Sequence, residues 1–371
     1  MKIGLVFFVY DLMFFVSVSV LQAQTVTNVT AEQVGKTIHV SYDLNKQADI
    51  TLFVSTDGGS TYTKLYRVSG DVGKNVSAGH KTIAWDVLAE RERLVGENIV
   101  FKVRALSEDD LTFTVNGVSF KMIYVKGGTF TMGCTSEQGS DCESNEKPSH
   151  SVILSDFWMG ETEVTQALWQ AVMGSTPTFE GGWESLYGKG NDYPAYKINW
   201  EVCKEFCNKL NSRLSDQLPS GCRFALPTEA QWEYAARGGN KSRNYKYCGS
   251  NNIEEVAWYW GNSGKTHLNG EWNYTRVYNN KCQTHPVRQK KANELGLYDM
   301  SGNVEEWCLD GYGNYSSSSQ TNPLDSSSDS FCTLRGGCWS DRAIDCRVSN
   351  RGGYWSDRCS HNIGLRLSLV R

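Results

Sequence analysis

The sequence predicts an α+β protein in two parts, an all-β sandwich followed by a larger, irregular and loop-rich domain. Residues 25–112 alternate apolar and polar positions in short runs separated by turn formers, whereas helical patterns appear only after residue 160. The 371 residues include 12 Trp, 18 Tyr and 35 Gly, which is typical of a globule with many loops and aromatic anchors. This length is sufficient for two domains that each have a core.

Residues 1–24 have the pattern of an export signal. Lys2 provides the positive end, an apolar run extends from Ile3 to Leu21, and the residues up to Ala23 form a small-residue cleavage site. Asp11 interrupts the apolar run, which argues against a transmembrane helix, although an uncleaved anchor remains the alternative. We therefore expect an exported protein that is periplasmic, held in the cell envelope or secreted.

The predicted sandwich occupies residues 25–112. Its strand patterns are Lys36–Tyr42, Asp49–Ser55, Lys81–Val87 and Asn98–Ala105. Gly-rich turns separate them, and such spacing indicates an antiparallel sandwich of about seven strands. On this pattern alone, the segment is similar to the immunoglobulin or fibronectin-III-like modules of exported proteins, and residues 106–117 form the join to the next domain.

The second domain contains three helical patterns. Residues 165–173 place Leu168, Trp169 and Val172 on one face, and a second pattern extends over residues 199–210. The third begins after Thr228, a suitable amino-terminal cap, and ends at two glycines. The rest of the chain, from residue 240, is predicted to be loop with short strands.

Charge and cysteine content narrow the function classes. The net charge is −4 and the pI is about 5.9, so no basic patch indicates nucleic acid as a partner. All twelve cysteines follow residue 133, and an even number in an exported chain favours disulfides. Cys134 and Cys142 flank a short loop and are candidates to pair. No spacing matches a CxxC zinc site.

The segment Gly296–Trp307 (GLYDMSGNVEEW) concentrates oxygen-bearing groups around a glycine. Calcium takes six to eight oxygen ligands and tolerates irregular geometry. The carboxylates of Asp299 and Glu306, with the carbonyls of Gly302 and Val304, are therefore a candidate calcium set. The alternative is a turn whose acidic side chains face water. The EF-hand pattern is absent.

Several segments together resemble the formylglycine-generating enzyme family, also called the sulfatase-modifying-factor domain. The resemblance covers residues 118–371, and its segments, in family order, are KGGTFTMG (126–133), ETEVTQALWQAVMG (161–174), YPAYKINWEVCKEFCNKL (193–210), LPTEAQWEYAARGG (226–239), THPVRQKKANELGLYDMSGNVEEWCLD (284–310), LRGGCWSD (334–341), CRVSNR (346–351) and NIGLRL (362–367).

The resemblance implies an irregular α+β fold that is distantly similar to C-type lectins. It also implies structural calcium, placed by motif on Asp299, Gly302, Val304 and Glu306. The best-known members oxidise a sulfatase cysteine to formylglycine with O2 and a copper ion held by two thiolates. Here the second thiolate position is Cys346, but the first is Asp341, and Cu(I) prefers soft thiolate ligands.

The cysteines near the expected copper site allow two interpretations. Cys338, which replaces the usual serine after Gly336-Gly337, could pair with Cys346 as displaced metal ligands and preserve the oxidase reaction on a sulfatase-type polypeptide. The alternative is a structural disulfide among Cys332, Cys338, Cys346 and Cys359 in a chain without the ancestral chemistry.

We therefore expect a non-catalytic binding or structural module of the cell envelope, with the formylglycine-generating oxidase as the alternative. Aromatic rings suit sugar faces and protein partners. The aromatic loops 258–260, 272–274 and 354–355 are candidates to bind glycans or envelope proteins, unless these rings belong to the core.

Overall fold

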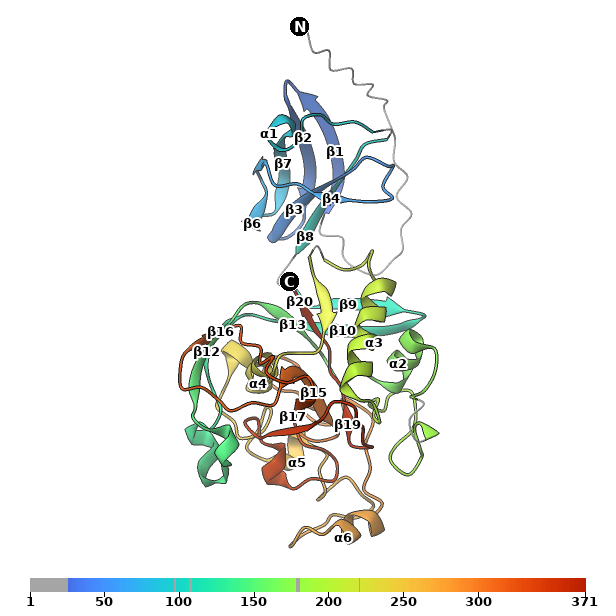
Figure 1. Cartoon of the computed structure of the whole chain (residues 1–371), viewed down its shortest axis with the longest axis vertical. Coiled ribbons are helices and arrows are strands. Elements are labelled where there is room, and N and C mark those ends of the chain that lie inside the picture. Colours follow the sequence, from blue (N-terminus) through green and yellow to red (C-terminus); the bar gives the residue numbers. More distant parts are fainter. Residues whose placement is uncertain (1–25, 97, 107–108, 178–180, 220) are drawn as a thin grey trace.

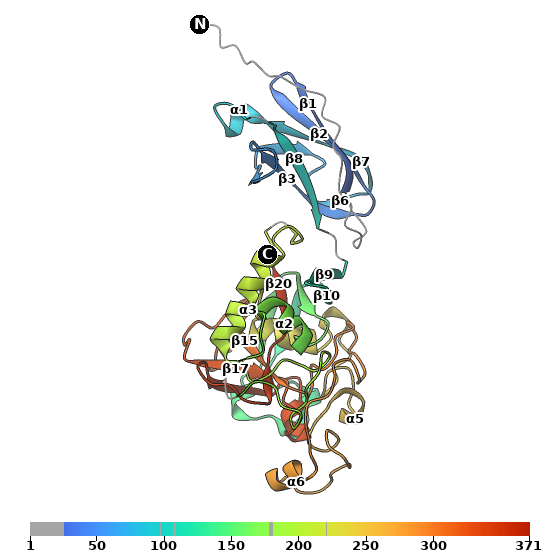
Figure 2. The same cartoon turned by 90° about the vertical axis from the view of Figure 1, so that its right-hand side faces the viewer.

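The computed structural model describes residues 26–96, 98–106, 109–177, 181–219 and 221–371. The predicted export signal, residues 1–24, lies outside the described residues. Within the described part of the chain, no helix is both long and apolar enough to span a bilayer. Both views show strands β1–β8 grouped apart from the rest of the chain (Figures 1 and 2).

Two sheets form the amino-terminal group, and they share one core. The first has the order β1-β2-β7-β5, and in the second β3 pairs with β4, β6 and β8. The elements are β1 (Val26–Val34), β2 (Thr37–Leu44), β3 (Ala48–Ser55), β4 (Thr63–Lys64), β5 (Val68–Gly70), β6 (Gly73–Val76), β7 (Gly79–Asp86), α1 (Val87–Glu90) and β8 (Val100–Leu106).

Period-two alternation explains these strands. Burial alternates along β2 and β3, so that Val40, Tyr42 and Leu52 face the shared core with Ile83 and Trp85. The strands predicted near residues 36–42, 49–55, 81–87 and 98–105 are confirmed. Assignment of these sheets to the immunoglobulin or fibronectin-III class remains a prediction.

The second group is mixed, with short strands, few helices and long loops. Its strands are β9 (Leu111–Val115), β10 (Val118–Val125), β11 (Gly128–Met132), β12 (His150–Leu154), β13 (Phe157–Gly160), β14 (Arg223–Ala225), β15 (Glu305–Gly311), β16 (Gln320–Thr321), β17 (Phe331–Arg335), β18 (Arg351–Trp355), β19 (Ile363–Gly364) and β20 (Ser368–Val370). They form sheets of order β14-β20-β13-β10-β9, β11-β12-β16 and β18-β17-β15-β19. The α-helices are α2 (Gln166–Met173), α3 (Trp200–Arg213), α4 (Glu229–Ala236), α5 (Ile253–Val256) and α6 (Tyr274–Asn279).

The three predicted helices are confirmed, and each begins after a residue whose side chain caps it. Thr165 accepts a hydrogen bond from the Leu168 amide, and Asn199 accepts one from the Val202 amide. Thr228 forms a capping box with Gln231 at the start of α4. Helices α2 and α3 pack on each other beside the sheet that contains β9, β10 and β14 (Figure 1).

A network of buried ion pairs runs through the core of this second group. Arg335, which is fully buried at the end of β17, contacts both Glu229 and Glu233 of α4. Arg351 forms a bidentate pair with Glu229, with nitrogen–oxygen distances of 2.7 Å. Loss of one partner of a buried ion pair is strongly destabilising, because it leaves an unpaired charge in the core. These pairs join α4 to β17 and β18 and so hold the helix in place on the sheet β18-β17-β15-β19.

The two groups touch through polar contacts near the chain's last strand. Arg371 forms an ion pair with Asp49 at 3.1 Å, and Lys46 forms one with Asp109 at 3.1 Å. Arg104 of β8 donates a hydrogen bond to the Leu218 carbonyl. Strand β9, which lies in the predicted join, pairs with β10 and so belongs to the second sheet system.

Candidate functional site

The Gly336-Gly337 turn brings three predicted site residues together. Both glycines have positive φ, and a Cβ on Gly337 would lie 2.9 Å from the Cys346 sulfur. The Asp341 carboxylate accepts a hydrogen bond from the Cys338 amide at 2.9 Å. Cys338, Asp341 and Cys346 therefore form one cluster behind the end of β17.

The thiols in this cluster are buried and face carboxylates. Cys338 and Cys346 are both 0% exposed. Burial, and then the nearby Asp341 carboxylate, raises the pKa of each thiol well above its usual value. Burial also raises the pKa of Asp341 to about 6. Such surroundings oppose thiolate formation, and a thiolate is the form that binds Cu(I).

Hydrogen bonds hold Cys338 in place. Its sulfur lies 3.1 Å from the Ser340 hydroxyl, and the Asn362 amide donates to it at 3.4 Å. Within the described residues, no three carboxylate, thiol or imidazole side chains converge closely enough to hold a metal ion by themselves.

The disulfide alternative for this cluster is wrong for three of the four cysteines. Cys332, Cys338 and Cys346 are free thiols. Cys332 lies in the core that contains α3, and its thiol donates a weak hydrogen bond to the Asp329 carbonyl at 3.7 Å. The predicted pair Cys134–Cys142 is confirmed by an S–S bond of 2.15 Å.

The predicted calcium loop packs directly against the thiol cluster. Ser301 donates a hydrogen bond to the Cys346 carbonyl at 2.8 Å, and the Trp339 amide donates to the Asn303 carbonyl at 2.9 Å. Gly302 has a φ of 78°, and a Cβ there would lie 2.2 Å from the Trp258 carbonyl oxygen. Only glycine fits this turn.

A buried arginine engages Glu306 of this loop. Both Glu306 oxygens accept hydrogen bonds from Arg366 at 2.7–2.9 Å, and the Trp232 indole donates a further bond at 2.6 Å. Arg366 and Glu306 are both buried. This ion pair could not be predicted from the sequence, because its partners lie 60 residues apart.

Two further carboxylates in the same interior are incompletely satisfied. Asp299 accepts a hydrogen bond from the Arg288 amide on one oxygen, and its other oxygen has no partner among the described residues. Glu163 accepts a bond from Asn303 at 3.3 Å, and its other oxygen is likewise without a partner there.

These carboxylates carry more negative charge than Arg366 neutralises. Burial, and then repulsion from Asp299, raises the pKa of Glu163 well above its usual value. Burial raises the pKa of Asp299 to about 6, with Glu306 contributing repulsion. Unpartnered buried oxygens in an anionic interior fit a hard cation. Sequence analysis missed Glu163, because its hydrogen-bond partner in this interior, Asn303, is 140 positions away in the chain.

The three aromatic loops differ in exposure. Tyr259 and Trp260 are buried, and the Trp258 ring lies between His285 at 3.7 Å and the Lys290 ammonium at 4.1 Å. The first loop, 258–260, is therefore mainly core. Trp272, Tyr274, Tyr354 and Trp355 are exposed, so the other two loops do present rings to solvent.

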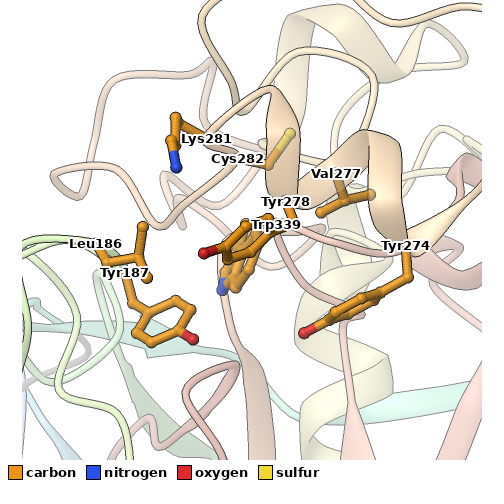
Figure 3. Close-up of a pocket in the computed structure, with 8 residues that line it drawn as sticks. All are labelled: Leu186, Tyr187, Tyr274, Val277, Tyr278, Lys281, Cys282 and Trp339. Carbon is orange, nitrogen blue, oxygen red and sulfur yellow. The ribbon is translucent and has the colours of Figure 1, made fainter.

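One aromatic loop borders a shallow cleft beside the thiol cluster. Figure 3 shows Tyr187 on one side and Tyr274 of α6 on the other, with Trp339 between them. Trp339 directly follows Cys338. The cleft has a volume of only about 10 Å³.

Comparison with known proteins places this geometry in a family. Residues 113–370, well over half of the chain, match the sulfatase-modifying factor enzyme 1-like domain. The chain belongs to this family. The thiol cluster and the predicted calcium loop both lie within the matched residues, so the sulfatase-modifying-factor resemblance predicted from sequence is confirmed.

Relatives within the sulfatase-modifying factor family carry different names. The chain is 40% identical over 218 residues to the chaperone protein LppX of Paenibacillus barcinonensis, covering 52% of this chain and 71% of that protein. It is 26% identical over 297 residues to the formylglycine-generating enzyme of Streptomyces coelicolor, covering 66% of this chain and 87% of the enzyme. The solved structure of Treponema denticola variable protein 1 aligns with a TM-score of 0.56 and 31% identity, covering 70% of this chain and 98% of that one.

Proposed function

We propose that this protein is an exported, non-catalytic member of the sulfatase-modifying factor family that binds a partner in the cell envelope. The observation that carries the proposal is Asp341, a carboxylate at the position where the family resemblance places the first copper thiolate. The neighbouring thiols are buried and face carboxylates, which supports the loss of the thiolate pair. A relative named as a chaperone supports a binding role within the family.

In this proposal the amino-terminal part, residues 25–112, is an immunoglobulin- or fibronectin-III-like sandwich that serves as a spacer or docking arm. The domain from residue 118 onward provides the binding surface. The partner is a glycan or an envelope protein, reached through the exposed aromatic loops. Alternating burial along β2 and β3 supports the sandwich assignment.

The alternative is the formylglycine-generating oxidase, with Cys346 and Cys338 as displaced copper ligands. It is favoured by one observation, that Cys346 lies against Gly337, the residue directly before Cys338. Such a site would supply copper and O2 chemistry toward a sulfatase-type polypeptide.

A Cu(I) titration decides between these functions. We expect the reduced wild-type protein to bind no stoichiometric Cu(I) in competition with a chromogenic chelator, since one position of the thiolate pair is a carboxylate. The variant Asp341→Cys restores the pair and is expected to gain tight Cu(I) binding. A matched variant, Asp345→Cys, is expected to gain none. Stoichiometric Cu(I) on the wild-type protein, lost in Cys338→Ser, would support the oxidase.

We further propose that the anionic interior beside the loop holds calcium. In this proposal Asp299 and Glu163 supply carboxylate oxygens and Gly302 and Val304 supply the carbonyls that the family resemblance implies, while Glu306 stays paired with Arg366. The unpartnered oxygens of Asp299 and Glu163 support this site.

Calcium removal is expected to lower thermal stability. At one hundred times the Kd, a ligand that binds only the folded state adds about 2.7 kcal/mol to the free energy of unfolding. Calorimetry of chelator-treated protein at neutral pH should therefore show a rise in Tm of several degrees on addition of Ca²⁺. Glu163→Gln should reduce this rise, whereas the exposed control Glu201→Gln should not. An unchanged Tm with Ca²⁺ would exclude the site.

A further inference from the structure

The segment of residues 265–282, which contains α6, carries a positive charge, in contrast to the chain as a whole. It contains two lysines, one arginine and one glutamate, whereas the whole chain carries a net charge of −4. Three of its rings are exposed: Trp272 by 43%, Tyr274 by 52% and Tyr278 by 53%. An exposed group of aromatic rings beside cations is typical of a binding surface.

The rings are held in place before any ligand arrives. The Trp272 indole donates a hydrogen bond to the Ser340 carbonyl at 2.8 Å. Arg276 of α6 donates hydrogen bonds to the carbonyls of Asn269 and Glu271 at 2.8 and 2.7 Å, and these bonds hold the preceding loop against the helix. Across the cleft, Tyr187 is stacked on His361 with ring centroids 4.2 Å apart. Such preorganisation lowers the entropic cost of binding.

The cleft offers flat faces, hydroxyl groups and one cation. Figure 3 shows the hydroxyl groups of Tyr187 and Tyr274 on the two sides of the cleft and the Lys281 ammonium above its rim. This ammonium lies 4.8 Å from the centre of the Tyr278 ring, and Lys281 is exposed to solvent. The cleft volume of about 10 Å³ leaves no room for a deeply inserted side chain.

We propose that this cleft, defined by Tyr187, Tyr274, Tyr278, Lys281 and Trp339, binds an acidic sugar residue of a glycan, such as a uronic acid. The C–H groups of a pyranose ring are weakly positive and suit the negative face of an aromatic ring. Its carboxylate would pair with the exposed ammonium of Lys281. The tyrosine hydroxyls can bond to sugar hydroxyls. A sugar ring can lie across the exposed rings of Tyr274 and Tyr278 without entering the cleft, whereas an inserted peptide side chain needs a deeper pocket.

This inference rests on the proposed binding function, and calorimetric titration tests it. The probes are oligogalacturonate, a neutral galactose oligomer of equal length, and poly-glutamate. The wild-type protein should bind oligogalacturonate at least about tenfold more tightly than either other probe, a difference of about 1.4 kcal/mol. Tyr274→Ala and Tyr278→Ala should each weaken that binding about tenfold. Lys281→Asn, which suits the positive φ at this position, should remove the preference for the acidic sugar.

The control is Tyr66→Ala, a tyrosine between β4 and β5 that is more exposed, at 72%, and this variant should bind as the wild type does. Equal binding of poly-glutamate and oligogalacturonate would overturn the inference, since only charge would then be recognised. So would unchanged affinity in both tyrosine variants, or the absence of oligogalacturonate binding. Because the Cu(I) titration tests the non-catalytic function separately, a negative glycan result with no Cu(I) uptake overturns the sugar assignment alone.

Discussion

Replacing Arg366 with methionine is expected to lower the free energy of unfolding by about 3–5 kcal/mol. Arg366 is the buried cation against which Glu306 packs, and it also donates to the carbonyls of Gly160 and Tyr298 at 2.9 and 2.8 Å. Without it, Glu306 and the nearby Asp299 and Glu163 carboxyls lose their counter-charge. Chemical denaturation followed by tryptophan fluorescence measures this loss.

The matched control is Arg288→Met. Arg288 pairs with Glu161 at 3.0 Å, but its side chain is 55% exposed, so this pair is expected to contribute at most about 1 kcal/mol. The double variant Arg366→Met/Glu306→Met should be more stable than the single Arg366→Met, because it leaves one fewer unpaired buried charge. Equal denaturation midpoints for Arg366→Met and Arg288→Met would show that the buried pair does not have the assigned role.

The second large effect is expected at Arg347, which anchors the disulfide loop. Arg347 forms a bidentate pair with Glu146 at 2.6 and 2.9 Å, and neither side chain is exposed. Glu146 in turn accepts a bond from the Glu143 amide, and its carbonyl accepts one from the Cys134 amide. Arg347→Met should therefore cost about 3–5 kcal/mol and release residues 134–149.

Limited proteolysis with mass spectrometry locates this release. New cleavage sites should appear within residues 134–149 of the Arg347→Met variant and increase further after reduction of the Cys134–Cys142 disulfide. Arg342→Met removes an exposed pair with Asp345 and should leave the cleavage pattern unchanged. Cleavage that is identical in wild type and Arg347→Met would contradict the proposed anchoring.

Local sequence signals predicted much of the fold. Thr165, Asn199 and Thr228 cap their helices as their residue types indicate, because capping depends on the next few residues alone. The strands of the amino-terminal sheets follow from period-two alternation, which is also local. The pair Cys134–Cys142 joins residues only eight positions apart, close enough to be expected from spacing.

Ion pairs between residues far apart in the chain could not be predicted from the sequence. The ion pairs Arg366–Glu306 and Arg347–Glu146 join residues 60 and 201 positions apart, and no pattern within one element indicates them. Sequence analysis proposed Asp299 and Glu306 as calcium ligands. It missed Glu163 for the same reason, because Glu163 comes near them only in the folded chain. It also left open a disulfide near Cys338 and Cys346, because only the folded chain shows which cysteines pair.

The central claim is that the family scaffold persists here without its cysteine oxidation, because a carboxylate replaces one copper thiolate. The most direct test incubates the purified protein with copper, O2 and a cysteine-containing peptide of the sulfatase type, then traps aldehydes for mass spectrometry. The account predicts no aldehyde above the level given by heat-denatured protein. Formylglycine recovered from the peptide only in the presence of the folded protein would contradict it.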